Sequence, residues 1–253
     1  MTHSLIRQLW TTARPAFLLS FIVFAIPLLC TMQTSGAAEK TDTAPLKTAR
    51  QLKERLTKLS SLHFQFTQRT EGQMSGRVRT AQGEAYFIKS GEEAKMRWDY
   101  LKPDRQVIIS DGSELTMYFA NLNQMIVAPA DSLQQDVTYT FFTGTRSIEE
   151  DFIVRRGEKS PGTNTTPGQA ITSKETQRIK LLPKSSESQV KSIRLWIVDT
   201  STIKRIEIID KFDTVTTLDI DNIEENSLTS GRSAVDEDFF NFTPPKNTEI
   251  IRQ

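Results

Sequence analysis

The first periodic segment of the chain has the pattern of an amphipathic helix. Its apolar positions recur at spacings of three and four residues, with charged residues between them: Leu46, Ala49, Leu52, Leu56 and Leu59. This spacing places the apolar side chains on one face of a helix. The sequence therefore predicts a helix over 46–59 that packs its leucine face against another element.

After Ser60 the period changes to two, which is the period of a half-buried strand. Leu62, Phe64 and Phe66 alternate with polar residues, and about ten short segments of this kind follow, each closed by turn residues. They cover 83–89, 94–100, 105–110, 114–119, 124–128, 151–156, 176–182, 192–198, 203–209 and 215–220. We expect a meander of antiparallel strands.

Three segments depart from this alternation. Between 131 and 150, Asp131-Ser132 offers an N-cap before spaced apolar residues that include Phe141 and Phe142, so we expect a short helical excursion. A last helical turn is expected at 235–240. The segment 157–174 is rich in Gly, Pro, Ser and Thr without periodicity, which predicts a long exposed loop.

The N-terminal 37 residues have the composition of a cleaved signal peptide. Arg7 and Arg14 precede an apolar run at 16–29, and small residues follow at 35–38. We expect a signal peptide at 1–37, a flexible segment at 38–45 and one domain at 46–253. Cys30 would be a lipidated N-terminus only if processing occurred after Leu29, which is larger than the processing site favours.

The mature chain carries little reactive chemistry. It has no cysteine, a formal charge of about −1 with both signs interspersed, and no motif for phosphate or dinucleotide binding. Its single histidine, His63, lies on the polar side of its strand and is expected to be exposed. We therefore expect no enzyme activity, no metal, no cofactor and no nucleic-acid partner. A glycosidase using two of Asp99, Asp104, Asp111 and Glu114 stays open as an alternative.

Three segments carry a resemblance to a known family. They are 60–68, reading SSLHFQFTQ; 97–112, reading RWDYLKPDRQVIISDG; and 239–245, ending FTPP. With the leading helix, they resemble the periplasmic outer-membrane lipoprotein carrier family (LolA-like) over most of the mature chain.

The resemblance implies a fold and a task. The fold is mainly β with some α: an unclosed antiparallel β-barrel of about 10–11 strands around an apolar cavity covered by short helices. The implied task is to receive acylated lipoproteins from an inner-membrane ABC-type release complex. A monomeric carrier would take them across the periplasm to an outer-membrane receptor, where one exists.

Alternation and resemblance together select the candidate residues. The acyl-chain cavity is expected to be lined by Phe64, Phe66, Phe87, Met96, Trp98, Tyr100, Leu115 and Met117. The helical lid is expected to present Leu52, Leu56, Phe141 and Phe142. Met96, Met117 and Met125 suit a cavity that accepts flexible chains. An ordinary packed core is the alternative for each position, since alternation predicts a face without saying whether it is filled.

One position departs from the family pattern. Family members often carry a basic residue, tied to cargo handover, just after the strand at 83–89, and here Ser90 stands there, preceded by Lys89. Lys89 or Ser90 is therefore a weak candidate for partner contact. Other functions also stay open: a carrier or sensor of another lipid or glycolipid, a secreted hydrolase, or a binding module with a solid core.

Overall fold

The segments that alternate with a period of two form one large sheet. The segment with helical periodicity forms a helix that packs on this sheet. The structure is a computed structural model that describes residues 43–72, 76–90, 93–130, 142, 148–158, 176–199, 201–229 and 235–253. The predicted signal peptide, Phe141 and most of the predicted loop at 157–174 lie outside these residues.

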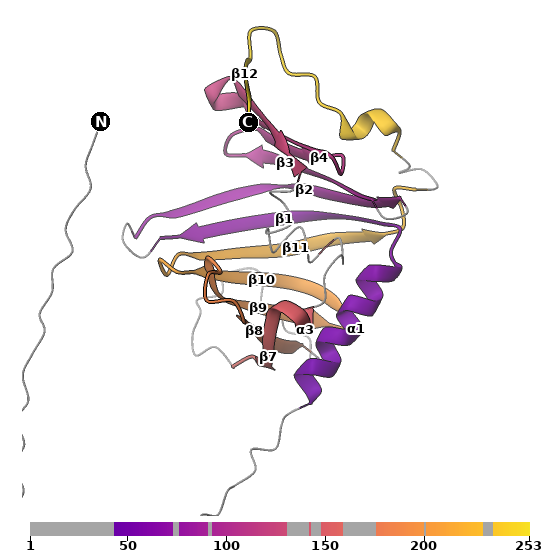
Figure 1. The fold of residues 1–253 in the computed structure, drawn as a ribbon, viewed down its shortest axis with the longest axis vertical. Helices are drawn as coiled ribbons and strands as arrows, with labels where there is room; N and C mark the ends of the chain where they lie inside the picture. The colour runs from indigo at the N-terminus through magenta and orange to yellow at the C-terminus, as the bar shows by residue number, and fades with distance from the viewer. Residues whose placement is uncertain are drawn as a thin grey trace, which may run out of the picture. The chain divides into compact units, whose positions relative to one another are not determined.

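The helices and strands follow one another as the alternation predicts (Figure 1). The helical elements are α1 (Ala44–Lys58), η1 (Ala120–Leu122), α3 (Ile148–Asp151) and η3 (Glu237–Phe240). The first strands are β1 (Ser61–Glu71), β2 (Val78–Ser90), β3 (Glu93–Lys102), β4 (Gln106–Ser110), β5 (Glu114–Phe119) and β6 (Gln124–Pro129). The later strands are β7 (Phe152–Arg156), β8 (Gln177–Pro183), β9 (Val190–Val198), β10 (Thr202–Asp210), β11 (Val215–Glu225) and β12 (Glu249–Arg252).

The strands form a single 12-stranded sheet in the order β12-β6-β5-β4-β3-β2-β1-β11-β10-β9-β8-β7. Its end strands β12 and β7 are not paired with each other, so the sheet is not closed into a barrel. This confirms the predicted mainly β, unclosed architecture. The count exceeds the predicted 10–11 strands because β12 was not foreseen, and β12 pairs with β6 in parallel rather than antiparallel orientation.

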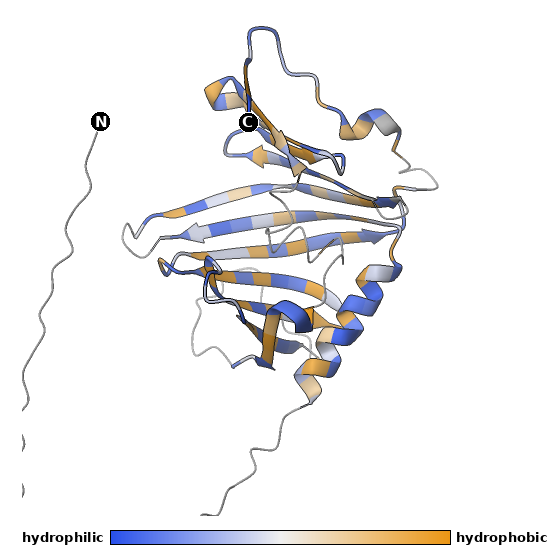
Figure 2. Cartoon of the chain, in the orientation of Figure 1, coloured by the Kyte–Doolittle hydropathy of each residue, from blue (hydrophilic) through white to orange (hydrophobic). Residues whose placement is uncertain are grey.

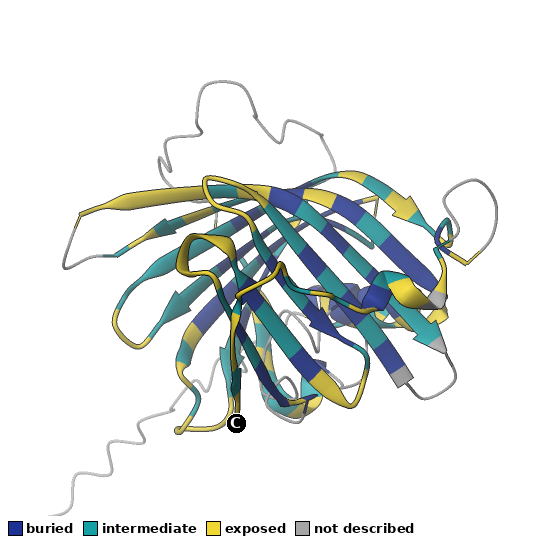
Figure 3. Ribbon diagram, turned by 90° about the horizontal axis from the view of Figure 1, so that it is seen from above, coloured by how far each residue is buried: buried dark blue, intermediate teal, exposed yellow. Residues whose placement is uncertain are grey.

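Strict alternation gives the sheet two distinct faces, visible as alternating colours along the strands in Figure 2. We call the face that carries Phe64 and Trp98 the inner face, and the opposite face, which carries His63 and Arg97, the outer face. Buried segments lie in the middle of the strands, while several hairpin turns are exposed (Figure 3).

Helix α1 covers part of the inner face and packs on β7 and β8. Pro45 near its first turn is compatible with helix initiation, and Arg55 and Lys58 in its last turn oppose the negative end of the helix dipole. Leu52 and Leu56 are buried against the sheet, as the spacing predicts. Arg55 also pairs with Glu225 of β11 at 2.7 Å.

Candidate functional site

Aromatic rings from neighbouring strands meet on the inner face. The ring centroid of Phe64 lies 5.8 Å from that of Trp98 and 6.1 Å from that of Phe87. Phe66 continues the cluster, with its centroid 4.9 Å from Trp98 and 5.0 Å from Tyr100. These rings form a continuous apolar surface across β1, β2 and β3.

Two small residues of β2 allow this contact. Ala85 stands between Phe64 and Trp98 in the register, and Gly83 stands between Phe66 and Tyr100. A Cβ atom at Gly83 would come within 2.1 Å of the Asp99 carbonyl oxygen and 2.9 Å of the Phe66 ring. The rings of β1 and β3 therefore meet across β2 because the β2 residues between them have a methyl group or no side chain. A small residue between two aromatic strands is the sequence signal that pattern reasoning missed.

The predicted cavity residues all lie in this one cluster, which we call the inner cluster. Those that are buried are Phe64, Phe66, Phe87, Met96, Trp98 and Leu115. Tyr100 and Met117 are partly buried and pack against it. The structure thus brings together the residues that alternation assigned to one face.

The described lid residues contact the same cluster. Leu52 is completely buried and Leu56 nearly so. The ring of Phe142 lies 4.9 Å from Phe64 and 5.1 Å from Phe87, measured between centroids. Phe142 therefore covers the aromatic rings, while Leu52 and Leu56 of α1 belong to the same cluster where the helix packs on β7 and β8.

Lys89 lies where the lid helix ends. Its Nζ donates a hydrogen bond to the carbonyl oxygen of Leu56, one of the last carbonyls of α1. Partial burial lowers the pKa of Lys89 below its ordinary value. The structure therefore ties the strand that carries the candidate handover position to helix α1, while the side chain of Ser90 lies outside the description.

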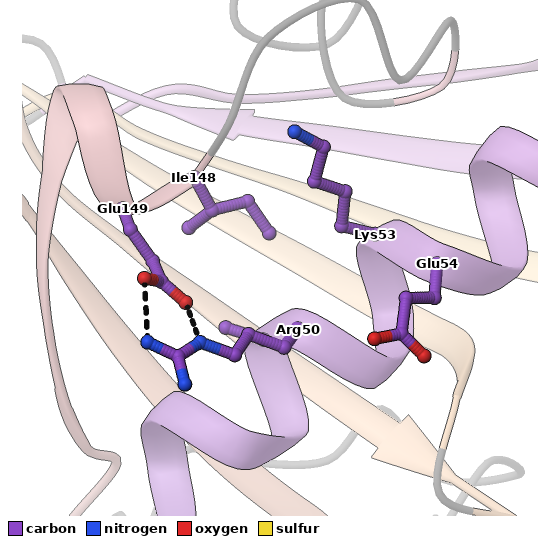
Figure 4. A pocket seen from close by; sticks show the side chains of 6 residues that line it. Arg50, Lys53, Glu54, Ile148 and Glu149 are labelled. Atoms are coloured by element: carbon purple, nitrogen blue, oxygen red, sulfur yellow. Dashed lines mark hydrogen bonds and ion pairs between the residues drawn. The ribbon is translucent and has the colours of Figure 1, made fainter.

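A shallow groove separates α1 from α3, with a volume of about 210 Å³ (Figure 4). Ala49 and Ile148 provide its apolar lining, and Lys53 and Glu54 are among its charged residues. Arg50 forms a bidentate ion pair with Glu149 across it, through Nε and a second bond of 3.0 Å from Nη2. The hydrogen bond from Arg50 lowers the pKa of Glu149.

The outer face carries a polar cluster around His63, which alternation places on the correct face but with the wrong exposure. His63 was expected to be exposed, but its side chain is only 16% exposed and stacks on Tyr86 at 4.5 Å. Its Nε2 lies 3.3 Å from a Glu84 carboxylate oxygen, and Tyr86 donates a hydrogen bond to the same carboxylate. Cross-strand pairing covers His63 because its neighbours on β2 are long side chains.

A second apolar cluster, the outer cluster, also lies on the outer face. It consists of Val107, Ile109, Tyr118, Met125, Val127 and Phe240. Its presence corrects the expectation for Met125, which belongs to this cluster and not to the inner one. Phe240 comes from the C-terminal segment, so residues after the last long strand cover β4, β5 and β6 from outside.

The sequence of this chain matches a known protein family over most of its length. Residues 57–243 match the family described as outer membrane lipoprotein carrier protein LolA. The chain belongs to this family. The LolA family therefore accounts for the segments on which the resemblance was based.

Curated relatives of this LolA family member carry the same description. An outer-membrane lipoprotein carrier protein of Nitrosomonas europaea is 29% identical over 175 residues, covering 69% of this chain and 74% of the relative. One from Methylococcus capsulatus is 25% identical over 229 residues, covering 90% and 96%. Among solved structures, a LolA superfamily protein of Nitrosomonas europaea is similar with a TM-score of 0.36 and 14% identity, covering 71% of this chain and 92% of that one.

Asp99 and Asp111, two of the four candidate carboxylates of this LolA family member, have structural partners. Asp99 pairs with Arg97 at 2.8 Å. Asp111 accepts hydrogen bonds from the backbone N–H groups of Ser113 and Glu114. Burial alone would raise the pKa of Asp111, but these bonds outweigh it and lower the pKa.

Within the described ranges, no three His, Cys, Asp or Glu side chains are grouped so that they could hold a metal ion. Across those same ranges, none of the helices has the length and apolar character needed to span a membrane.

Proposed function

We propose that this LolA family member is a periplasmic carrier that shelters the acyl chains of lipoproteins between the inner face of its sheet and the lid formed by α1 and Phe142. The observation that carries the proposal is the inner cluster, in which aromatic and methionine side chains form one apolar surface beneath a helix. The family and the names of its curated relatives supply the cargo class.

Exposure of lipoprotein acyl chains to water is unfavourable, so their transport needs an apolar binding site. Burying one methylene group is worth about 0.8 kcal/mol, so two or three acyl chains represent tens of kcal/mol of unfavourable exposure in water. A carrier must also release this cargo. Opening a lid costs free energy, which offsets part of the binding and keeps release possible.

The described structure is a closed form of this site. The Phe142 ring is in contact with the rings of Phe64 and Phe87, and Leu52 of α1 is completely buried. Acyl chains therefore reach the rings of Phe64 and Phe87 when Phe142 moves away, and reach the rest of the cluster when α1 leaves β7 and β8. The aromatic and methionine side chains can then repack around chains of varied length.

The carrier also needs a source and a destination. We propose that an inner-membrane ABC-type complex supplies lipoproteins and that an outer-membrane receptor accepts them, with the predicted signal peptide directing the protein to the periplasm. Depletion of the protein should then leave outer-membrane lipoproteins in the inner-membrane fraction.

Two tryptophans allow a direct test of where the cargo binds. Trp98 lies in the inner cluster and is 7% exposed, while Trp196 is on the outer face and is 6% exposed. They are equally buried but on opposite faces. Adding a triacylated lipopeptide should change the fluorescence of the mature protein and of Trp196→Phe, but only slightly that of Trp98→Phe.

The reverse pattern would contradict the proposed site, because the signal would then come from the outer face. Absence of any lipopeptide binding would contradict the cargo class. Mass spectrometry of lipids extracted from the purified protein would then show whether a glycolipid or another lipid occupies the site instead.

A further inference from the structure

The outer face of the sheet carries an unusual row of like charges near its β7 end. In the register, Arg155 of β7 stands opposite Lys180 of β8, and Lys180 stands opposite Arg194 of β9. Neighbouring strands are about 4.8 Å apart. Three cationic residues therefore follow one another across three strands.

The adjacent row adds two more cations. Arg178 of β8 stands opposite Trp196, which stands opposite Arg205 of β10. The guanidinium carbons of Arg178 and Arg205 lie 6.0 and 5.8 Å from the Trp196 ring centroid. Both rows lie on the face opposite the inner cluster, so none of these five side chains belongs to the proposed cargo site.

Two of these five cations are paired with acids. Arg194 pairs with Glu207 at 2.6 Å, and Arg205 pairs with Asp219. In the part of the chain that is described, no ion pair joins Arg155, Arg178 or Lys180 to an acidic residue. Like charges placed directly opposite each other destabilise a sheet. Arg178 contacts the Trp196 ring, but Arg155 and Lys180 stand opposite each other with no acid between them, an arrangement that folding alone does not favour.

We propose that this patch, defined by Arg155, Arg178 and Lys180 with Arg194 and Arg205 at its border, docks the protein on a membrane surface that contains anionic phospholipids. The concentrated positive charge attracts an anionic partner. A lipid surface is favoured over an acidic protein because Ile153, 43% exposed, lies two residues from Arg155 on the same side of β7. Cations bordered by an exposed apolar side chain are typical of interfacial binding.

The function of such docking is to bring the carrier close to a membrane without inserting it. A few basic residues near an anionic surface give weak binding that salt weakens further. The protein can therefore leave the surface again. The orientation also keeps the inner cluster on the face turned away from the lipid.

The test compares two variants of equal charge. The patch variant carries Arg155→Gln, Arg178→Gln and Lys180→Gln, and retains Arg194 and Arg205 because their acid partners are partly or fully buried. The control variant carries the same change at three exposed lysines on other elements: Lys58, Lys102 and Lys246. Cosedimentation is measured with phosphatidylcholine vesicles that contain or lack phosphatidylglycerol, at low and at physiological salt.

The mature protein and the control variant are expected to bind the phosphatidylglycerol vesicles in a salt-dependent way. Each basic residue near the surface contributes about fivefold to the partition coefficient, so the patch variant should bind on the order of 100-fold less tightly. Circular dichroism and lipopeptide binding should be unchanged in the patch variant, which separates this inference from the proposed carrier function.

Other outcomes overturn the inference. If the mature protein does not bind the anionic vesicles, or if both variants lose binding equally, the patch is not a membrane-docking surface. If only retention on immobilised polyglutamate depends on the patch, its partner is an acidic protein and the membrane assignment is wrong.

Discussion

At the scale of single residues, the hydrogen bond from Tyr86 to Glu84 shifts the pKa values of both side chains on the outer face. This bond lowers the pKa of Glu84 below its ordinary value of 4.5, and His63 and Gln65 add smaller contributions in the same direction. Burial and the same carboxylate raise the pKa of Tyr86, so its hydroxyl stays protonated and remains a donor. The pair therefore stabilises the fold mainly when Glu84 is ionised.

The pH dependence follows from the direction of the Glu84 shift. Because the pKa is lower in the folded state, ionisation contributes stability above pH 4.5, and this contribution is lost as pH falls through the lower folded value. Tyr86→Phe keeps the ring contacts with His63 and Phe239 but removes the donor. We expect it to lower the free energy of unfolding by about 1–2 kcal/mol at pH 7 and by much less at pH 3.

Urea unfolding at both pH values measures this difference. Tyr118→Phe is the matched control, since Tyr118 is buried in the outer cluster and its hydroxyl has no carboxylate partner among the described residues. Its effect should not change with pH. A Tyr86→Phe cost that is the same at both pH values would contradict the assigned role of Glu84.

The residue scale also shows what sequence can and cannot provide. Alternation placed Phe64, Trp98 and their neighbours on one face correctly, because it depends only on the pleat of each strand. It could not show that His63 is covered, because burial on the outer face depends on residues of other strands. Met125 was misassigned for a similar reason: its strand is apolar on both faces, so composition does not distinguish them.

At the scale of elements, helix α1 is held to the sheet chiefly by its buried leucines. Leu52 is completely buried, whereas Glu54 on the same helix is exposed. We expect Leu52→Ala to cost about 2–5 kcal/mol of stability through lost burial and the cavity left behind. If α1 is a separable lid, the loss should appear first as faster hydrogen exchange in α1, with β1 and β11 still protected.

Glu54→Ala is the control for this prediction, because an exposed helical position should change stability by about 0.5 kcal/mol or less. Exchange measured by mass spectrometry on both variants gives the comparison. Equal loss of protection in α1 and in the central strands of Leu52→Ala would show that the helix is an integral part of the core. The lid would then have to be sought in another segment.

Element boundaries were largely predictable. The alternating segments correspond to β1 through β11, and most predicted ends agree with the observed ends within two residues in either direction. Strands β11 and β2 are the main exceptions, since β11 ends at Glu225, beyond the predicted end at Ile220, and β2 begins at Val78, before the predicted start at Gly83. The first residues of β2 pair with the end of β1, and this pairing is set by the partner strand rather than by local alternation.

At the scale of the whole sheet, its two faces are covered by different parts of the chain. Helix α1 and Phe142 cover the inner cluster, and the C-terminal segment after residue 235 covers the outer cluster before adding β12 beside β6. The helical turn predicted at 235–240 is found as η3, but the sequence could not show that it covers the outer cluster, and β12 has only four residues and no clear period. Their positions depend on strands more than a hundred residues earlier.

This division predicts unequal effects for two C-terminal truncations. Removing residues 249–253 deletes β12 but leaves Phe240 and Phe242 on the outer cluster. Removing residues 235–253 uncovers Val107, Tyr118 and their neighbours. The shorter truncation should stay monomeric with a small loss of stability, whereas the longer one should bind a hydrophobic dye and aggregate, because a large apolar patch on a sheet is exposed.

Dye fluorescence and size-exclusion chromatography of the two truncated proteins measure this difference, and lipopeptide binding adds a second readout. The inner cluster lies on the opposite face, so the shorter truncation should still change Trp98 fluorescence when lipopeptide is added. If the longer truncation were as soluble and as free of dye as the shorter one, the C-terminal segment would not be the cover of the outer face. The apolar residues of β4 and β6 would then need another partner.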